Sequence, residues 1–276
     1  MKGFIILTST LFLLTSSIAL SSSISVQKVS EHLHILSGKD YGTNIGLVAT
    51  KNGLVLIDPM PGNNQLSALD EKIRSIYDKP ISFILNTHAH SDHTGGNAHF
   101  EKQGGKLIES SFNLDELTHI KVKSHTTIDN IYYHKESNSI FVGDVFDTSW
   151  HPTFYAGGIK GFNEAIEAIL NLGDDQSLII PGHGSPANKS SLLEFIKNTF
   201  TWINKIQELN QKGLGVEQIM IDTQVKDILE KFNINNKSPF LPQKAYKRFI
   251  ERTISVINDE KSIRHAGSHG IKHLSE

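Results

Sequence analysis

Three histidines and an aspartate that can bind a metal ion lie within one short segment of the sequence. They are His88, His90, Asp92 and His93, within residues 87–97. Imidazole and carboxylate groups are ligands for zinc, iron and manganese. The chain contains no cysteine, so a thiolate nucleophile, a disulfide and a cysteine-bound zinc are all excluded. The segment therefore predicts a metal site built from histidine and aspartate.

The residues around this cluster are typical of a tight turn that follows a buried strand. The apolar run 81–85 precedes the histidines, and Gly95 and Gly96 follow them. Such a turn brings four ligands together at little further cost in conformational entropy. Glycine lets the backbone bend sharply close to bound ions. A solvated polar turn is the alternative, but it does not require this concentration of histidine, and we favour the metal site.

The segment 88–93, His-Ala-His-Ser-Asp-His, resembles the metal signature of the metallo-β-lactamase superfamily. In that family the first two histidines of the motif join a later histidine at one metal. The aspartate and the third histidine join a last histidine at a second metal, and a Gly-Asp carboxylate bridges both ions. The resemblance implies three further ligands here, which are His125 in Ser-His-Thr, Asp144 in Gly-Asp and His183 in Pro-Gly-His-Gly.

The resemblance covers residues 26–210 and implies both a fold and a reaction. The implied fold class is α/β (α+β), as the four-layer αββα sandwich of that family. The implied cofactor is two Zn²⁺ ions per chain, with iron or manganese left open. The implied enzyme is a dinuclear zinc hydrolase in which a metal-bridging hydroxide attacks an ester, thioester, lactone or amide-type carbonyl. A β-lactamase activity stays open.

Two aspartates are expected to do more than complete a ligand set. We expect Asp92 to be catalytic as well as a ligand, by orienting the nucleophile and accepting its proton. Asp58 follows the apolar run 54–57 and resembles a family aspartate that contacts a metal-binding histidine without binding the metal itself. It is equally well interpreted as a turn residue before Pro59.

Two features depart from the family pattern. The interval between His93 and His125 is shorter than the family predicts, which leaves one wall of the pocket unassigned. Threonine and isoleucine follow His125 at the positions where the family often has glycine. His119 and, more remotely, His134 are therefore alternatives to His125 as the ligand.

The loop that follows Asp144 is expected to line the substrate pocket. Its pocket candidates are Asp147, Trp150, His151 and Tyr155. Aromatic side chains there would either cover a substrate or cap the core. The lack of cysteine argues against those β-lactamase subclasses that place cysteine on the second metal. Two other functions stay open, a persulfide-dioxygenase-like oxidoreductase with a single iron and a non-catalytic metal-binding protein.

Runs typical of strands and helices alternate in two successive blocks without a low-complexity linker, which predicts one domain over residues 26–260. Strands are expected at residues 32–36, 43–49, 54–58, 81–85, 106–108, 129–133, 139–142 and 177–180. Helices are expected at residues 64–77, 96–102, 162–170, 192–206, 216–232 and 243–257.

The two ends of the chain differ in composition from this domain. Residues 1–23 resemble a cleavable signal peptide, with Lys2 before the apolar run 4–14 and small residues after it. This predicts a periplasmic or secreted protein with no stable membrane insertion after cleavage. Residues 261–276 are expected to form a disordered, histidine-containing tail. The net charge of −2 gives no reason to expect nucleic acid as a partner, and a small-molecule substrate is expected instead.

Overall fold

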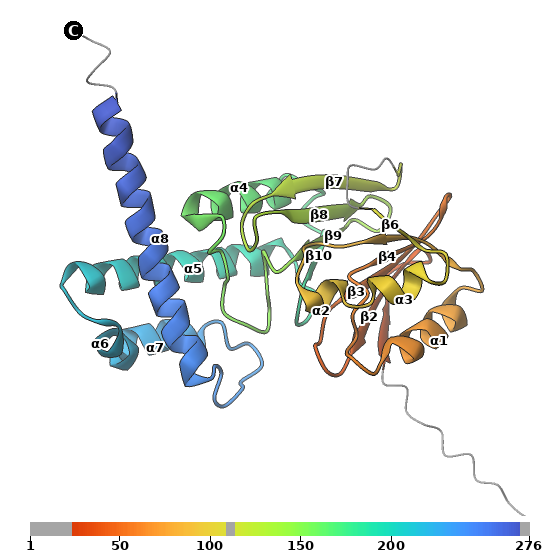
Figure 1. Cartoon of the computed structure of the whole chain (residues 1–276), viewed down its shortest axis with the longest axis horizontal. Coiled ribbons are helices and arrows are strands. Elements are labelled where there is room, and N and C mark those ends of the chain that lie inside the picture. Colours follow the sequence, from red (N-terminus) through yellow and green to blue (C-terminus); the bar gives the residue numbers. More distant parts are fainter. Residues whose placement is uncertain (1–23, 109–113, 271–276) are drawn as a thin grey trace, which may run out of the picture.

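The computed structural model describes residues 24–108 and 114–270, with side chains described up to residue 260. In this part of the chain two β-sheets face each other, and helices cover the outer side of each sheet (Figure 1). This arrangement confirms the α/β sandwich expected from the sequence.

The first sheet contains six strands in the order β1-β2-β3-β4-β5-β6. Their bounds are β1 (Ile24–Lys28), β2 (Leu33–Gly38), β3 (Ile45–Thr50), β4 (Gly53–Ile57), β5 (Ile81–Leu85) and β6 (Lys106–Leu107). The first four strands pair antiparallel, and β4, β5 and β6 pair parallel. Parallel neighbours need crossover connections, which are α1 (Leu66–Ile76) before β5, and α2 (Ser91–Thr94) with α3 (Asn97–Glu101) before β6.

The second sheet contains four strands in the order β10-β9-β8-β7. Their bounds are β7 (Leu117–Val122), β8 (Asp129–His134), β9 (Ser139–Gly143) and β10 (Leu178–Pro181). Strands β7, β8 and β9 pair antiparallel, whereas β10 is parallel to β9. Helix α4 (Gly158–Leu170) is the crossover between β9 and β10.

The alternation of side chains along β4 accounts for the layers. Successive residues of a strand point to opposite faces of its sheet. Leu54 and Leu56 belong to the core that the first sheet shares with α1 and α3. Val55 and Ile57 belong instead to the core between the two sheets, where Phe141 of β9 also lies. All four β4 side chains are at most 2% exposed, so this strand is apolar throughout.

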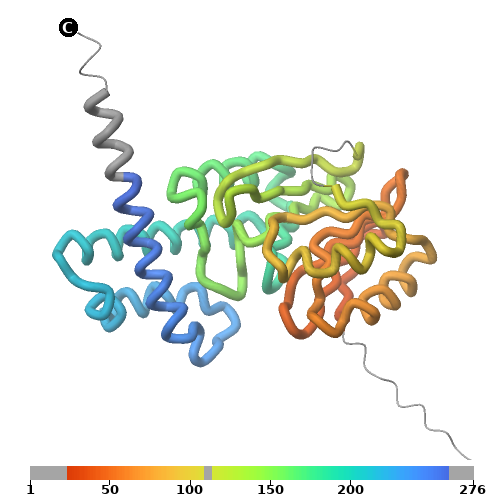
Figure 2. Tube along the Cα trace, viewed as in Figure 1, coloured from red at the N-terminus to blue at the C-terminus, as the bar shows by residue number. Residues whose placement is uncertain are grey.

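The C-terminal helices extend the core on the outer side of the second sheet. They are α5 (Lys189–Gln211), α6 (Val216–Ile221), α7 (Thr223–Glu230) and α8 (Gln243–Gly270). Trp202 of α5 is fully buried, and its indole Nε1 donates a hydrogen bond to Oγ1 of Thr253 on α8 at 2.9 Å. In Figure 2 these helices lie at the opposite end of the molecule from α1.

The structure differs from the sequence prediction in four places. Strands β1 and β7 and the short helix α2 were not predicted. The prediction of a single helix over residues 216–232 was wrong, because the backbone leaves the helical conformation at Asp222. The Asp222 side chain accepts a hydrogen bond from the backbone N–H of Val225 and so caps a new helix, α7.

The two terminal predictions fall largely beyond the described residues. The expected signal peptide, residues 1–23, lies outside them. Helix α8 continues to Gly270, past residue 261 where we expected the tail to begin, and residues 271–276 lie outside the described part. Among the residues that the structure does describe, no helix has the length and apolar character needed to span a membrane.

Candidate metal centre

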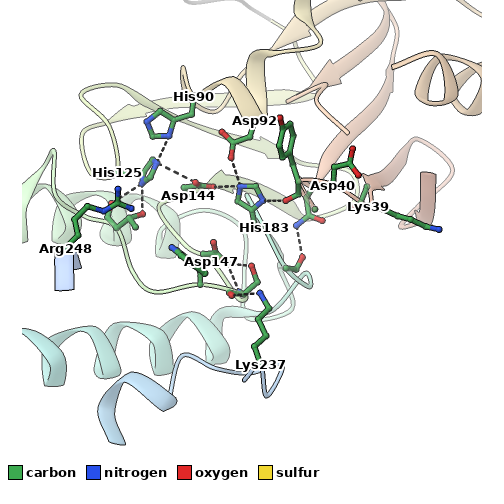
Figure 3. A pocket seen from close by; sticks show the side chains of 18 residues that line it. Lys39, Asp40, His90, Asp92, His125, Asp144, Asp147, His183, Lys237 and Arg248 are labelled. Carbon is green, nitrogen blue, oxygen red and sulfur yellow. Dashed lines mark hydrogen bonds and ion pairs between the residues drawn. The ribbon is translucent and has the colours of Figure 1, made fainter. Parts of the chain in front are cut away.

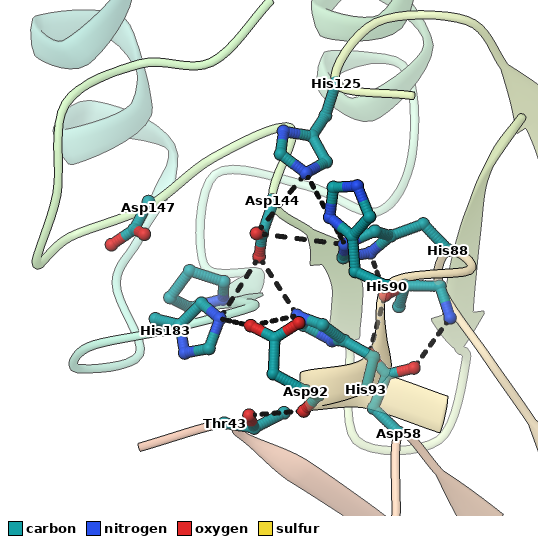
Figure 4. A network of polar contacts seen from close by, with 12 residues as sticks. Thr43, Asp58, His88, His90, Asp92, His93, His125, Asp144, Asp147 and His183 are labelled. Atoms are coloured by element: carbon teal, nitrogen blue, oxygen red, sulfur yellow. Dashed lines mark hydrogen bonds and ion pairs between the residues drawn. The ribbon is translucent and has the colours of Figure 1, made fainter. Parts of the chain in front are cut away.

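The seven expected ligands come together in two adjacent groups at one edge of the sandwich (Figure 4). The first group is His88, His90, His125 and Asp144, and the second is Asp92, His93 and His183. Within each group, the potential ligand atoms lie within 4.8 Å of one another. Chain segments far apart in the sequence therefore meet at this edge.

Three imidazole nitrogens converge in the first group. His90 Nδ1 lies 3.1 Å from His88 Nε2 and 3.0 Å from His125 Nε2. Oδ2 of Asp144 lies 3.8 Å from His88 Nε2 and 3.5 Å from His125 Nε2. Three nitrogens that face one another with a carboxylate oxygen beside them suit a shared cation better than a set of mutual hydrogen bonds.

The second group is arranged around the other oxygen of Asp144. Asp92 Oδ2 lies 3.2 Å from His183 Nε2 and 3.9 Å from His93 Nε2. Asp144 Oδ1 lies 3.4 Å from His93 Nε2 and 3.7 Å from His183 Nε2. The Asp144 carboxylate therefore lies between the groups and directs one oxygen toward each.

Two glycines allow this carboxylate to take its position. Gly143, at the end of β9, has a positive φ of 52°, which glycine adopts without strain. A Cβ atom on Gly143 would also collide with the side chain of Thr87. A Cβ atom on Gly182, which follows β10, would overlap Oδ1 of Asp144. These contacts explain physically why glycine precedes Asp144 and also precedes His183.

Hydrogen bonds behind the site orient four of the five histidine rings. In each of these rings, the nitrogen that points away from the centre contacts a protein oxygen. The pairs are His88 Nδ1 with Thr87 Oγ1 at 3.2 Å, His93 Nδ1 with Asp58 Oδ2 at 2.9 Å, His125 Nδ1 with Thr153 Oγ1 at 2.6 Å, and His183 Nδ1 with the Tyr41 carbonyl at 3.0 Å. Such contacts fix ring orientation at metal sites.

Two buried atoms at the centre lack a hydrogen-bond partner among the described residues. They are His93 Nε2 and Asp144 Oδ1. A buried polar atom without a partner is costly. A metal ion would satisfy both atoms at once, so the residues present fit a metal at this place.

The electrostatics of the metal-free centre divide the histidines into two kinds. Burial lowers the pKa of His88 to about 3, so its ring is neutral. Burial also opposes the charged form of His93, but Asp58 and Asp144 outweigh it and raise the pKa of His93 to about 11. The pKa of His183 is likewise raised, to about 9, because contacts with Asp92 and Asp144 outweigh burial. The pKa of Asp144 is lowered although the carboxyl is buried, since several imidazoles surround it.

The centre opens on one side into a cleft of about 810 Å³ (Figure 3). His90, Asp92, His125, Asp144 and His183 line its floor. Three of the four expected pocket residues face the cleft or the hollow next to it. Asp147 and Trp150 line the cleft, whereas Trp150 and Tyr155 line a neighbouring hollow of about 720 Å³.

His151 lies elsewhere than expected, because its ring belongs to the core and lines neither space. It is fully buried, stacks on Phe249 with ring centroids 4.5 Å apart, and contacts Trp202 edge-on. Burial lowers its pKa to about 3, so the ring behaves as a neutral aromatic group. The two alternative ligands also lie outside both groups of ligands. His119 contacts Asn130 at 2.9 Å, and His134 contacts Ser137 at 2.7 Å.

Several residues that line the cleft were not predicted from the sequence. Lys39, Asp40 and Tyr41 belong to the connection between β2 and β3, while Lys237 and Arg248 come from the C-terminal part of the chain. Lysines and arginines on a polar helix face are ordinary in any soluble protein. No local pattern could have assigned these five residues to the cleft, because only packing brings them there.

Part of the chain is similar to the metallo-β-lactamase superfamily. Residues 38–111 match the family model described as "Metallo-beta-lactamase superfamily", and this stretch contains the His-Ala-His-Ser-Asp-His segment.

Two curated relatives with different names are similar to this chain. "Metallo-beta-lactamase type 2" of Bacillus sp. (strain 170) is 23% identical over 217 residues, which are 65% of this chain and 81% of that protein. A "Probable hydroxyacylglutathione hydrolase" of Schizosaccharomyces pombe is 28% identical over 148 residues, which are 46% of this chain and 57% of that protein. Both names describe hydrolases, which supports a hydrolase at a general level.

Solved structures share the fold. A metallo-β-lactamase from Pontibacter korlensis superposes with a TM-score of 0.53 at 20% identity, covering 64% of this chain and 99% of that chain. A metallo-β-lactamase from Hirschia baltica gives a TM-score of 0.51 at 21% identity, covering 64% of this chain and 95% of that chain. At such identities the likeness concerns the fold, and the activity must be argued from the site.

Proposed function

We propose that this chain is a dinuclear zinc hydrolase of small-molecule esters, thioesters, lactones or amides. The observation that carries the proposal is the position of Asp144, whose two carboxylate oxygens face two different groups of ligands. Each group offers three further ligands, all histidine or aspartate, which suits zinc. A cleft of about 810 Å³ borders both groups, whereas structural zinc sites are usually closed.

The chain's own residues would bind the ions, position the substrate and accept one proton. His88, His90 and His125 would hold the first ion, and Asp92, His93 and His183 the second, with Asp144 shared. When bound, two zinc ions supply a water-derived nucleophile at neutral pH and polarise the substrate carbonyl.

Asp92 would be both a ligand and the catalytic carboxylate. Its side chain is 36% exposed, lines the cleft and lies against His183. A hydrogen bond with His183 lowers the pKa of Asp92 to about 2, so the carboxylate is ionised at neutral pH, as a metal ligand must be. The hydroxyl of Thr43 donates to the backbone carbonyl of Asp92 at 2.7 Å and holds this residue at the start of α2.

The site of action and the substrate are parts of the same proposal. The composition of residues 1–23 supports export to the periplasm or the medium. Similarity to a metallo-β-lactamase keeps β-lactams among the candidate substrates, and similarity to a hydroxyacylglutathione hydrolase keeps thioesters among them.

Metal content is the decisive test. The chain without residues 1–23 should bind about two zinc ions, and His90→Ala and His183→Ala should each lower this number. His119→Ala is the matched control, because His119 lies outside both groups of ligands and should leave the content unchanged. The loaded protein should then hydrolyse at least one member of a panel of esters, thioesters, lactones and β-lactams. A single iron that survives His183→Ala, together with sulfur-dependent oxygen uptake, would contradict the proposal and indicate an oxidoreductase.

A further inference from the structure

The cleft above the metal centre continues into a second hollow along helix α8. This hollow has a volume of about 720 Å³ and shares five lining residues with the first cleft. They are His90, His125, Trp150, Thr153 and Arg248. A substrate whose carbonyl lies at the metal centre therefore has room to extend toward α8.

One face of α8 forms a wall of this hollow. Its lining residues on that helix are Arg248, Phe249, Arg252, Ser255, Val256 and Asp259. Most of them are separated by three or four positions, which places them on one side of a helix. The sequence had left a wall of the pocket unassigned, because the interval before His125 is short. Helix α8 supplies a wall beside His125, from a distant part of the chain.

Two guanidinium groups dominate the charge on this wall. Arg248 and Arg252 are both exposed and lie one helical turn apart, a rise of about 6 Å. Among the residues with described side chains, neither arginine has a carboxylate within ion-pair distance. The hollow's own acid, Asp259, lies about two turns beyond Arg252, roughly 10 Å along the axis. The hollow therefore presents two positive charges that form no direct ion pair with a described carboxylate.

Tyr155 holds one of these arginines in place. The Arg252 guanidinium carbon lies 5.4 Å from the centroid of the Tyr155 ring, which is a cation–π contact. The Tyr155 hydroxyl donates to the backbone carbonyl of Phe249 at 3.4 Å, so the ring is itself anchored to α8. A guanidinium held in this way loses less conformational entropy when it binds an anion.

We propose that the hollow along α8 is a subsite for a carboxylate on the substrate, bound by Arg248 and Arg252. The guanidinium group matches the two oxygens of a carboxylate with two parallel hydrogen bonds. The substrate class is then an anionic ester, thioester, lactone or amide whose carboxylate lies away from the reacting carbonyl. This inference rests on the proposed hydrolase function for its reaction, but the subsite itself is a property of α8 and Tyr155.

Hydrolysis of matched esters tests the subsite on the zinc-loaded protein. The anionic substrates are mono-p-nitrophenyl esters of succinate, glutarate, adipate and suberate, and the neutral ones are p-nitrophenyl alkanoates of equal chain length. We expect kcat/KM to be about 10-fold higher for the anionic ester of the best length, through a lower KM. Arg248→Gln and Arg252→Gln should each remove most of this preference, because each raises the KM of the anionic esters more than that of the neutral esters.

Lys247→Gln is the matched control for loss of one positive charge on α8. Lys247 is the neighbour of Arg248 in sequence but pairs with Glu217 of α6, and it lines neither space. This variant should keep the preference for anionic esters. Esters cleaved at equal rates whatever their charge, or a preference that survives both arginine substitutions, would overturn the subsite and leave the hydrolase proposal intact.

A binding measurement separates the subsite from the reaction. Trp150 lines both the cleft and the hollow, whereas Trp202 is fully buried, so tryptophan fluorescence reports on the hollow. Adipate or suberate should change this fluorescence in the metal-free protein, and the double variant Arg248→Gln/Arg252→Gln should abolish the change. If no ester is cleaved but this arginine-dependent binding persists, the reaction is wrong and the subsite stands. A change that the double variant retains would refute the subsite.

Discussion

Oδ2 of Asp58 lies 2.9 Å from Nδ1 of His93, and both side chains are at most 2% exposed. The same carboxylate accepts hydrogen bonds from the backbone N–H of Thr87 at 2.8 Å and from its hydroxyl at 2.6 Å. Asp58 also adopts a positive φ of 53° directly after β4. The two interpretations of Asp58 from the sequence are therefore compatible, because this residue makes the turn and also directs His93 Nε2 toward Asp144.

The first prediction concerns this contact. Asp58→Asn keeps the size of the side chain, and asparagine tolerates a positive φ, so the substitution mainly removes a charge. We expect metal affinity at the second group to fall about 10- to 100-fold, because loss of a supporting carboxylate weakens the histidine ligand. Competition with a chromophoric chelator measures this affinity. Asp70→Asn, which removes a surface carboxylate that pairs with Arg74, is the control and should change nothing. Equal affinities in both variants would show that Asp58 serves only the turn.

The second prediction separates a shared ligand from an unshared one. Asp144→Asn should weaken the binding of both ions, because each oxygen of this carboxylate faces a different group. Asp92→Asn should weaken only the binding of the ion in the second group, since the ligands that the Asp92 carboxylate contacts, His93 and His183, both belong to that group. Elemental analysis after dialysis should find about one zinc per chain in Asp92→Asn and less in Asp144→Asn. Equal zinc content in the two variants would contradict a bridging role.

The third prediction concerns protons released when metal binds. The pKa values of His93 and His183 are raised to about 11 and about 9, so both rings carry a proton on the metal-free chain at pH 7. A metal can bind Nε2 only after that proton leaves. Zinc binding at pH 7 should therefore release about two protons from these rings, in addition to any proton that the metal-bound water loses, and zinc affinity should rise as the pH increases toward 9. Calorimetry in buffers of different ionisation enthalpy counts the protons. A zinc affinity that does not change between pH 6 and pH 9 would contradict this charge state.

The fourth prediction concerns the unity of the domain. Phe249 of α8 is 1% exposed and belongs to the same core as Ile140 of β9. Phe249→Ala should cost about 3–5 kcal/mol of unfolding free energy, as such truncations do in cores. The matched control is Ile221→Ala, at a side chain that is 71% exposed, where we expect a change within about 0.5 kcal/mol. Denaturant unfolding should show one transition that moves as a whole. Two separate transitions, with only one shifted by Phe249→Ala, would indicate that the C-terminal helices fold as a second domain.

The sequence by itself determined the types of the expected ligands and most of the elements that position them. The segment 88–93 contains four expected ligands within a few residues of a strand end, so local spacing alone places them close together. The apolar run 81–85 coincides with strand β5, since a buried parallel strand is apolar on both faces. Asp144 and His183 were instead implied by the resemblance to the family, through the segments Gly-Asp and Pro-Gly-His-Gly.

Only the tertiary structure decided which side chains face the cleft. His151 lies in the same loop as Trp150, yet Phe249 and Trp202 enclose its ring in the core. Arg248 lies more than one hundred positions from His125 and still shares the cleft with it. Periodicity and spacing encode contacts between near neighbours in the chain, whereas these contacts depend on how α8 packs against α4, α5 and α6. The direction of each Asp144 oxygen is likewise set by packing, since Gly182 and the facing imidazoles fix the carboxylate only after the two halves of the sandwich have met.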